Sequence, residues 1–220
     1  QGGAGTSLNM NANEVIANRA IELLGGNKGD YSIINPNDDV NCSQSTNDVI
    51  PTAGKMTSLR LLKNLKHELL QLHGALCKKA EEFNDVIKMG RTQLQDAVPI
   101  RLGQEFRAYS VAIMRDIHRM EKAMGEMRTL NLGGTAVGTG LNADEAYLHR
   151  IVPILSEVSD MDLAQAYDLI DATQNLDVFV AVSGAVKACA VTLSKIANDL
   201  RLMSSGPRAG LAEINLPAKQ

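Results

Sequence analysis

The stretch from Leu62 to Leu76, LKNLKHELLQLHGAL, decides how the rest of the sequence is interpreted. Its leucines follow one another at alternating intervals of three and four residues, which is the spacing of a seam in a supercoiled helical bundle. The same face continues in both directions and comprises Leu59, Leu62, Leu65, Leu69, Leu72, Leu76, Ala80 and Phe83. A helix over residues 56–83 would be about 40 Å long, so we expect an elongated bundle rather than a small globule.

Two more long helices are expected from similar apolar spacing, one from about Pro99 to Met127 and one from about Asp171 to Met203. Gly206-Pro207 would end the third. A helix capped by Ser7 or Asn9 should end near Leu24, and a further helix should cover residues 143–158. Ser45 or Thr46 offers a cap for the helix that holds Pro51 in its first turns.

No stretch shows the alternation of a strand, and no repeat of fixed period is found. The predicted fold class is therefore all-α, an elongated bundle of long helices over residues 1–220 that buries more surface by oligomerising.

Composition narrows the classes of function. The 220 residues are 45% hydrophobic and 21% charged, with a net charge of -3, so neither a nucleic-acid footprint nor a basic membrane surface is indicated. No apolar run approaches the roughly 20 residues of a membrane span. Three widely spaced cysteines argue against a disulfide framework and favour a reducing, cytoplasmic setting.

The sequence contains no common catalytic or ligand-binding motif with the required residues at the required spacing. The glycine-rich GGAGTS lacks the lysine of a phosphate-binding loop, and NPNDDVN lacks the central glycine and final glutamate of a calcium loop. The four histidines have no metal-ligand spacing, and no nucleophile motif is present. We therefore expect no metal site.

Three polar loops remain as candidates for binding an anion. They are residues 5–13, residues 43–48 with the sequence SQSTND, and residues 91–96 with the sequence RTQLQD. Hydroxyls, amides and backbone N–H groups near helix N-termini suit a dianionic dicarboxylate, because many fixed donors stabilise negative charge without a counter-charge for each. The residues alone leave a second interpretation open, in which these loops only cap helices.

Five segments carry a resemblance to a known family. In chain order they are QGGAGTSLNMNANEVIAN, NPNDDVNCSQSTNDVIPT, GRTQLQDAVPIRLGQEF, GGTAVGTGLN and SGPRAGLAEINLP, and they cover the chain nearly end to end. Together they resemble the aspartase/fumarase superfamily and, within it, the aspartate ammonia-lyases. The resemblance implies that residues 1–220 are the central helical domain of that fold, without its N-terminal and C-terminal domains. It also implies a homotetramer in which three subunits contribute to each active site.

The implied reaction is the reversible deamination of L-aspartate to fumarate and ammonia without a cofactor. By resemblance, Thr6, Ser45 and Thr46 would hold the β-carboxylate of the substrate. Asn47 would reach the amino group, and Thr92 would meet the α-carboxylate with Gln93 beside it.

Two positions separate the branches of the superfamily. Gln93 stands where fumarases carry histidine, and an amide can orient a substrate but cannot act as a proton donor in the way an imidazole can. Aspartases have glutamine there, so Gln93 favours that branch. Asn35 also stands where fumarases carry a histidine in a secondary anion site.

The family's flexible loop, with its catalytic serine base and a following lysine and asparagine, would begin just after Gln220. We therefore expect no catalytic base in this chain and no activity from residues 1–220 alone. Fumarate hydratase and a non-catalytic helical oligomerisation module are the alternatives.

Overall fold

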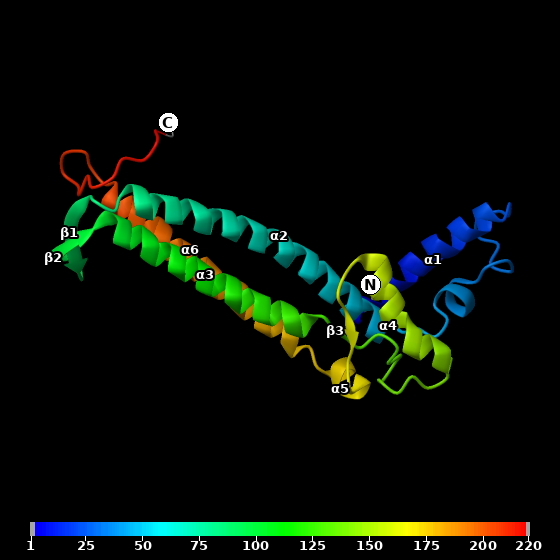
Figure 1. The fold of residues 1–220 in the computed structure, drawn as a ribbon. Helices are drawn as coiled ribbons and strands as arrows, with labels where there is room; N and C mark the ends of the chain where they lie inside the picture. The colour runs from blue at the N-terminus through cyan, green and yellow to red at the C-terminus, as the bar shows by residue number, and fades with distance from the viewer. Residues whose placement is uncertain (1–2, 219–220) are drawn as a thin grey trace. The chain divides into compact units, whose positions relative to one another are not determined.

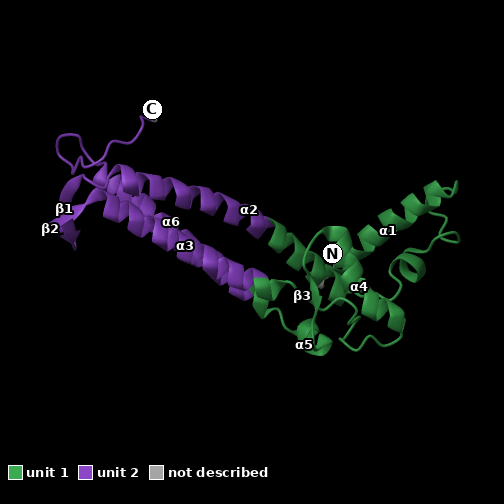
Figure 2. Ribbon diagram, in the orientation of Figure 1, with its two compact units in different colours: residues 1–60, 125–179 green, residues 61–124, 180–220 purple. Residues whose placement is uncertain are grey.

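The computed structural model describes residues 3–218 and is mainly helical (Figure 1). It divides into two compact units (Figure 2). Unit 1 comprises residues 1–60 and 125–179, and unit 2 comprises residues 61–124 and 180–220. The longest helix, α2 (Thr46–Glu82), contributes to both units, because the division falls after Arg60.

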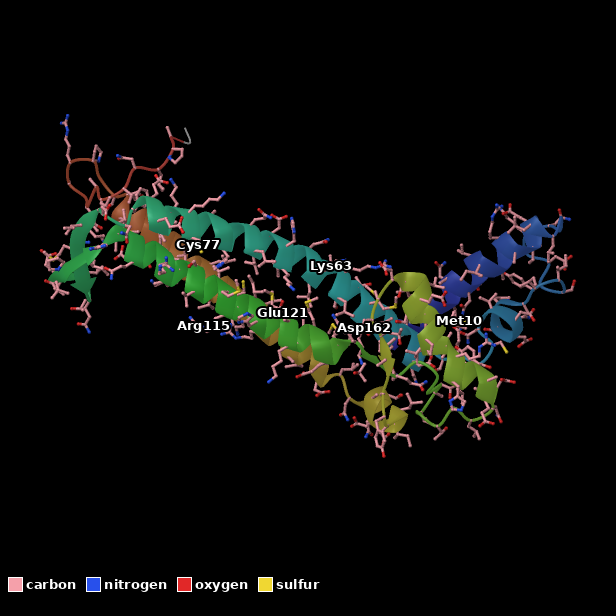
Figure 3. All side chains as sticks on the ribbon, in the orientation of Figure 1. Met10, Lys63, Cys77, Arg115, Glu121 and Asp162 are labelled. Atoms are coloured by element: carbon pink, nitrogen blue, oxygen red, sulfur yellow. The ribbon has the colours of Figure 1, made fainter. Side chains whose placement is uncertain are left out.

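Unit 2 is built on three long helices, namely the later part of α2, α3 (Leu102–Met127) and α6 (Asp177–Met203). Their apolar faces form one core, which includes Leu62, Leu69, Leu76, Phe106, Ile113, Ile117, Met120, Ala185, Cys189 and Ile196. The leucine seam therefore faces inward as predicted, while Lys63 lies on the exposed side of α2 (Figure 3). The predicted bundle of long helices is confirmed in this unit.

The prediction that no strand is present was wrong. Strands β1 (Ile87–Thr92) and β2 (Gln95–Arg101) pair antiparallel, with Ile87 opposite Arg101 and Thr92 opposite Gln95. The register shifts between Met89 and Arg91, which marks a bulge. Helix α3 consequently begins at Leu102 rather than near Pro99, because Pro99 lies within β2.

Unit 1 contains the shorter elements. These are η1 (Gly3–Gly5), α1 (Thr6–Leu23), the π-helix η2 (Pro36–Val40), α4 (Glu145–Ser159), α5 (Leu169–Gln174) and the two-residue parallel strands β3 (Thr129–Leu130) and β4 (Ala164–Gln165).

Two predicted helix starts need correction. The N-cap of α1 is Gly5, in a left-handed conformation with a φ of 89°, and neither Ser7 nor Asn9 caps the helix because both lie inside it. The helix predicted from Asp171 is broken in two, since α5 ends at Gln174 and α6 begins at Asp177.

Helix α6 is unusually apolar for its length. By length and composition alone it could cross a membrane, with a mean hydropathy of 1.5 over its most apolar window. Lys187 and Lys195 interrupt its sequence, so it contains no unbroken apolar run of the kind excluded above. One side of the helix packs in the core of unit 2 through residues such as Cys189 and Ile196, while only 17% of its most apolar window is buried.

Candidate functional site

The turn that begins α2 is fixed by a reciprocal capping arrangement. The backbone N–H of Asn47 donates to the Ser45 hydroxyl at 3.2 Å, and the backbone N–H of Ser45 donates to the Asp48 carboxylate at 3.0 Å. This is a capping box with aspartate at its fourth position. The prediction that Ser45 caps this helix is therefore confirmed, and Thr46 and Asn47 occupy the first turn, where the helix dipole favours negative charge.

The start of α1 lies against the start of α2. Gly5 has no space for a side chain, because an added Cβ would lie 3.0 Å from the Ile50 side chain. Four residues into α1, the buried Asn9 amide donates to the Thr46 hydroxyl at 3.1 Å. The Thr6 hydroxyl is exposed and lies 3.4 Å from the carbonyl oxygen of Gly3. The ends of two helices are thus held together by contacts that involve neutral polar groups.

The orientation of the Asn47 amide is set by the glycine-rich segment that follows β3. Its Nδ2 donates to the carbonyl oxygen of Ala136 at 2.7 Å, which leaves Oδ1 as the acceptor end of the side chain. Asn131 is fully buried and donates to the Asn47 carbonyl oxygen at 3.0 Å and to the Thr173 hydroxyl at 3.2 Å. Asn47 therefore contacts the glycine-rich segment with both its side chain and its backbone.

A groove of about 570 Å³ lies beside this turn. Its polar lining includes Thr46, Asn47 and Thr173, and its apolar lining includes Ile50, Pro51, Leu176 and Phe179. The groove belongs wholly to unit 1, so the polar turn borders a mostly apolar space large enough for a small molecule.

Asp48 is the buried acid of this region and has no accessible surface. Burial raises the pKa of its carboxyl above the ordinary value, and the backbone N–H groups of Ser45, Thr135 and Gly133 act in the opposite direction. Further along α2, the buried Lys55 ammonium donates to the carbonyl oxygen of Thr129 at 2.7 Å, and burial lowers its pKa. Both charged groups lie on α2 in unit 1 and bond to the segment 129–135.

Thr92 and Gln93 lie at the tip of the β1–β2 hairpin in unit 2. Both are exposed, and the two loop residues Gln93 and Leu94 have φ angles of 50° and 64°. A two-residue hairpin loop with both φ angles positive is normally occupied by asparagine and glycine. Glutamine and leucine in such a turn are a departure from this preference, and strained residues of this kind cluster at functional sites.

The structure thus sorts the six predicted site residues into two groups. Thr6, Ser45, Thr46 and Asn47 lie in unit 1 at the adjoining ends of α1 and α2, whereas Thr92 and Gln93 lie on the hairpin of unit 2. Their roles toward a ligand stay predictions. Sequence reasoning placed Asn9 and Asp48 in the candidate polar loops without giving either a contact, and it missed Asn131. The Ser45-x-x-Asp48 spacing was the local signal for the cap.

Comparison with known proteins identifies the family. A family model described as "Lyase" matches residues 1–220. The chain belongs to this lyase family.

Curated relatives are similar to the lyase-family chain over its whole length. The aspartate ammonia-lyase of Bacillus subtilis (strain 168) is 58% identical over 220 residues, which cover 100% of this chain and 46% of that protein. The aspartate ammonia-lyase of Helicobacter pylori (strain ATCC 700392 / 26695) is 54% identical over 220 residues, covering 100% and 47%. The chain therefore spans about half the length of these relatives.

Solved structures share the fold of the lyase-family chain. A crystal structure of fumarate lyase:delta crystallin from Brucella melitensis bound to cobalt superposes with a TM-score of 0.97 at 55% identity, covering 100% of this chain and 48% of that one. A recombinant class II fumarase from Schistosoma mansoni gives 0.94 at 35% identity, with coverages of 100% and 49%. The helical fold is therefore that of the aspartase/fumarase superfamily.

Proposed function

We propose that this lyase-family chain supplies part of the active site of an enzyme that reversibly deaminates L-aspartate to fumarate and ammonia. Relatives described as aspartate ammonia-lyases, 53 to 58% identical over the whole chain, support the choice of reaction. The observation that carries the proposal is the orientation of Asn47. With Nδ2 bonded to Ala136, Oδ1 is the end available to accept hydrogen bonds, and a substrate ammonium offers only donors.

The proposed binding mode assigns each carboxylate to neutral donors. Thr6, Ser45 and Thr46 hold the β-carboxylate at the ends of α1 and α2, and Thr92 on the hairpin of a different subunit meets the α-carboxylate with Gln93 orienting it, in a site that three subunits build. The Ser45 hydroxyl already accepts from the Asn47 N–H, so its own proton is available for a carboxylate oxygen. Donors at the start of α2 also have the positive end of the helix dipole behind them.

In the proposed reaction a base removes a proton from C3, and the electron pair moves into the β-carboxylate, which then carries additional negative charge. The C2–N bond breaks as the C2–C3 double bond forms, releasing ammonia and fumarate. Donors aimed at the β-carboxylate stabilise this intermediate by about 3 to 4 kcal/mol each, by analogy with oxyanion holes. We propose no cofactor, since carboxylate stabilisation replaces an external electron sink.

We propose that the base lies outside residues 1–220. The six site residues are alcohols and amides, and none is an ordinary base at neutral pH. Residues 1–220 purified alone should therefore release no fumarate from L-aspartate, and measurable release would contradict this placement of the base.

We propose a homotetrameric assembly in the cytoplasm. Helix α6 exposes Val180 at 72% and Val191 at 63%, which is apolar surface that unit 2 does not cover. The three cysteines are free, which fits a reducing compartment. Light scattering on the complete enzyme tests the assembly, and a monomeric mass would contradict it.

One assay on the complete enzyme separates the two enzymatic candidates. Consumption of fumarate that requires ammonium supports the deaminase, whereas consumption in water without ammonium supports fumarate hydratase, the reaction suggested by the likeness to the class II fumarase. The non-catalytic alternative is tested by Thr92→Ala, at an exposed position. A scaffold should lose only stability, whereas the proposed site should lose turnover while the melting temperature changes little.

A further inference from the structure

The Asp48 carboxylate is surrounded by backbone donors from two separate segments. Its Oδ1 accepts from the N–H of Ser45 at 3.0 Å, and its Oδ2 accepts from the N–H groups of Gly133 at 3.2 Å and Thr135 at 3.0 Å. The residue is fully buried. A single carboxylate therefore joins the cap of α2 to the glycine-rich segment 133–136, which is more than a capping box requires.

The segment held by Asp48 has a strained backbone. Thr135 has a φ of 57°, and a β-branched residue in the left-handed region is a clear outlier. Such a conformation persists only where the surroundings impose it, and the bond from the Thr135 N–H to Asp48 is a contact that does so. Close packing adds to this, because a Cβ at Gly138 would lie 2.4 Å from the Cα of Ile170.

The strained segment in turn orients Asn47. The carbonyl that accepts from Asn47 Nδ2 belongs to Ala136, the residue directly after Thr135. The chain of contacts runs from the Asp48 carboxylate to the Thr135 N–H, along the backbone to the Ala136 carbonyl, and from there to the Asn47 amide. Asp48 is adjacent to Asn47 in sequence yet acts on its side chain through this segment.

We propose that Asp48 is a positioning residue for the amino group of the substrate, because it holds the strained turn whose Ala136 carbonyl keeps Asn47 Oδ1 facing the ligand. This inference rests on the proposed function and deepens it, since it assigns the selectivity for an ammonium-bearing dicarboxylate to a buried carboxylate that does not touch the ligand. A purely stabilising Asp48 would affect all dicarboxylates alike.

The variant Asp48→Asn separates these two roles in the complete enzyme. An amide can accept at only one end, so its NH₂ must face either the Ser45 N–H or the Gly133 and Thr135 N–H groups. We expect the KM for L-aspartate to rise about tenfold, because Asn47 Oδ1 would lose its hydrogen bond to the charged ammonium of the substrate. The inhibition constant of succinate, a dicarboxylate without an amino group, should change less than about twofold because its contacts do not involve Asn47.

The variant Thr135→Gly provides the rescue. Glycine adopts a positive φ without strain, so the turn depends less on Asp48 once the threonine is removed. The double variant Asp48→Asn/Thr135→Gly should recover most of the affinity for L-aspartate. Asp144→Asn is the matched control, because Asp144 is an exposed cap of α4 that accepts two backbone N–H groups and lies outside this chain of contacts.

Equal weakening of L-aspartate and succinate, an unchanged KM, or no rescue by Thr135→Gly would overturn the proposal. Should Asp48→Asn fail to fold, Asp48→Glu decides, because its extra methylene displaces the turn while keeping the charge. It must raise the KM for L-aspartate relative to the succinate constant, and an unchanged ratio overturns the proposal.

Failure of the proposed function has a separate signature. If the unmodified complete enzyme does not deaminate L-aspartate, the proposed reaction is refuted. Amide hydrogen exchange then tests separately whether Asp48 holds the turn that orients Asn47. Faster exchange at Gly133 and Thr135 and in the Asn47 side chain in Asp48→Asn supports the role of Asp48, whereas unchanged exchange at these groups overturns it.

Discussion

The Arg91 guanidinium donates to the Glu213 carboxylate at 2.8 Å, which ties the β1–β2 hairpin to the segment after α6 within unit 2. Lys88 joins the same pair, with its ammonium 3.1 Å from Glu213 and 3.0 Å from Glu105. The side chains of Lys88 and Glu213 are only 8% and 13% exposed. The hairpin that carries Thr92 and Gln93 is thus anchored by charges that are largely withdrawn from solvent.

Removing the charge of Glu213 should destabilise the hairpin anchor. In Glu213→Gln, Lys88 keeps Glu105 while Arg91 keeps only the exposed Asp96 at 3.7 Å, so we expect a loss of about 2 to 3 kcal/mol in unfolding free energy. Urea unfolding followed by circular dichroism measures it. The exposed Glu126→Gln serves as control and should change stability by less than about 0.5 kcal/mol. Equal stabilities for the two variants would contradict the anchor.

The turn at the hairpin tip should be improved by glycine. Leu94 is 68% exposed with a φ of 64°, so Leu94→Gly removes left-handed strain and loses little packing. We expect stabilisation by about 0.5 to 1 kcal/mol. Leu94→Ala keeps the strain and should give no gain. A melting temperature raised equally by both substitutions would show that strain is not the cause.

Thr92→Ala tests whether the β1–β2 hairpin contributes to the proposed site. Thr92 is exposed at the end of β1, so its removal should change stability by less than about 0.5 kcal/mol. If Thr92 donates to a substrate carboxylate, its removal should lower kcat/KM about 100-fold. Thr92→Ser keeps the hydroxyl and should retain most of the wild-type kcat/KM. Thr57→Ala, at an exposed position of α2, is the control for turnover. Full activity in Thr92→Ala would remove Thr92 from the site.

Tyr147 should make stability fall in alkaline solution. Burial raises the pKa of its hydroxyl to about 12, with the charges of Asp48 and Cys42 adding to the shift. Between pH 10 and pH 12 the folded protein keeps a proton that the unfolded chain loses, so the unfolding free energy decreases as pH rises through this window. In Tyr147→Phe this decrease should be smaller, and the part that remains is expected from Tyr109, whose pKa burial also raises.

Tyr147→Phe should also change the stability of the protein at neutral pH. Among residues 3–218 the buried Tyr147 hydroxyl has no hydrogen-bond partner, so its removal should stabilise the protein by about 1 kcal/mol. Tyr167→Phe is the control, because Tyr167 is fully exposed and should change neither quantity. Thermal melts at pH 7 and pH 11 measure both effects, and parallel melting shifts in the two variants would contradict them.

The helices of unit 2 could be predicted because each repeats its apolar face over many turns, and the seam from Leu62 to Leu76 is buried as that pattern requires. The β1–β2 hairpin could not be predicted from the sequence. Its partly buried positions include Lys88, Gly90 and Arg91, which do not form an apolar alternation. Their charges are balanced by Glu105 and Glu213, and Glu213 lies 122 residues from Arg91 in the sequence.

The residues of the candidate site were predicted one by one from the resemblance. The structure adds the buried polar contacts that support them. Ser45 was expected as a cap and is one. The bonds that Asp48 accepts from Gly133 and Thr135, and the bond from Asn131 to the Asn47 carbonyl oxygen, span 84 to 87 residues along the chain. No periodicity or spacing in the sequence connects such distant partners. Buried polar contacts of this kind become visible only when the fold is known.

The groove beside Asn47 has a practical meaning for biocatalysis. In the reverse of the proposed reaction ammonia adds to fumarate, and the apolar lining formed by Ile50, Leu176 and Phe179 belongs to the same groove as Asn47, which we propose binds the amino group. Phe179 also limits the space at Gly54, where a Cβ would lie 3.3 Å from its ring. Shortening Phe179 while leaving Asn47 and Ala136 intact is therefore a rational first step toward adding alkylamines to fumarate and making N-substituted aspartic acids.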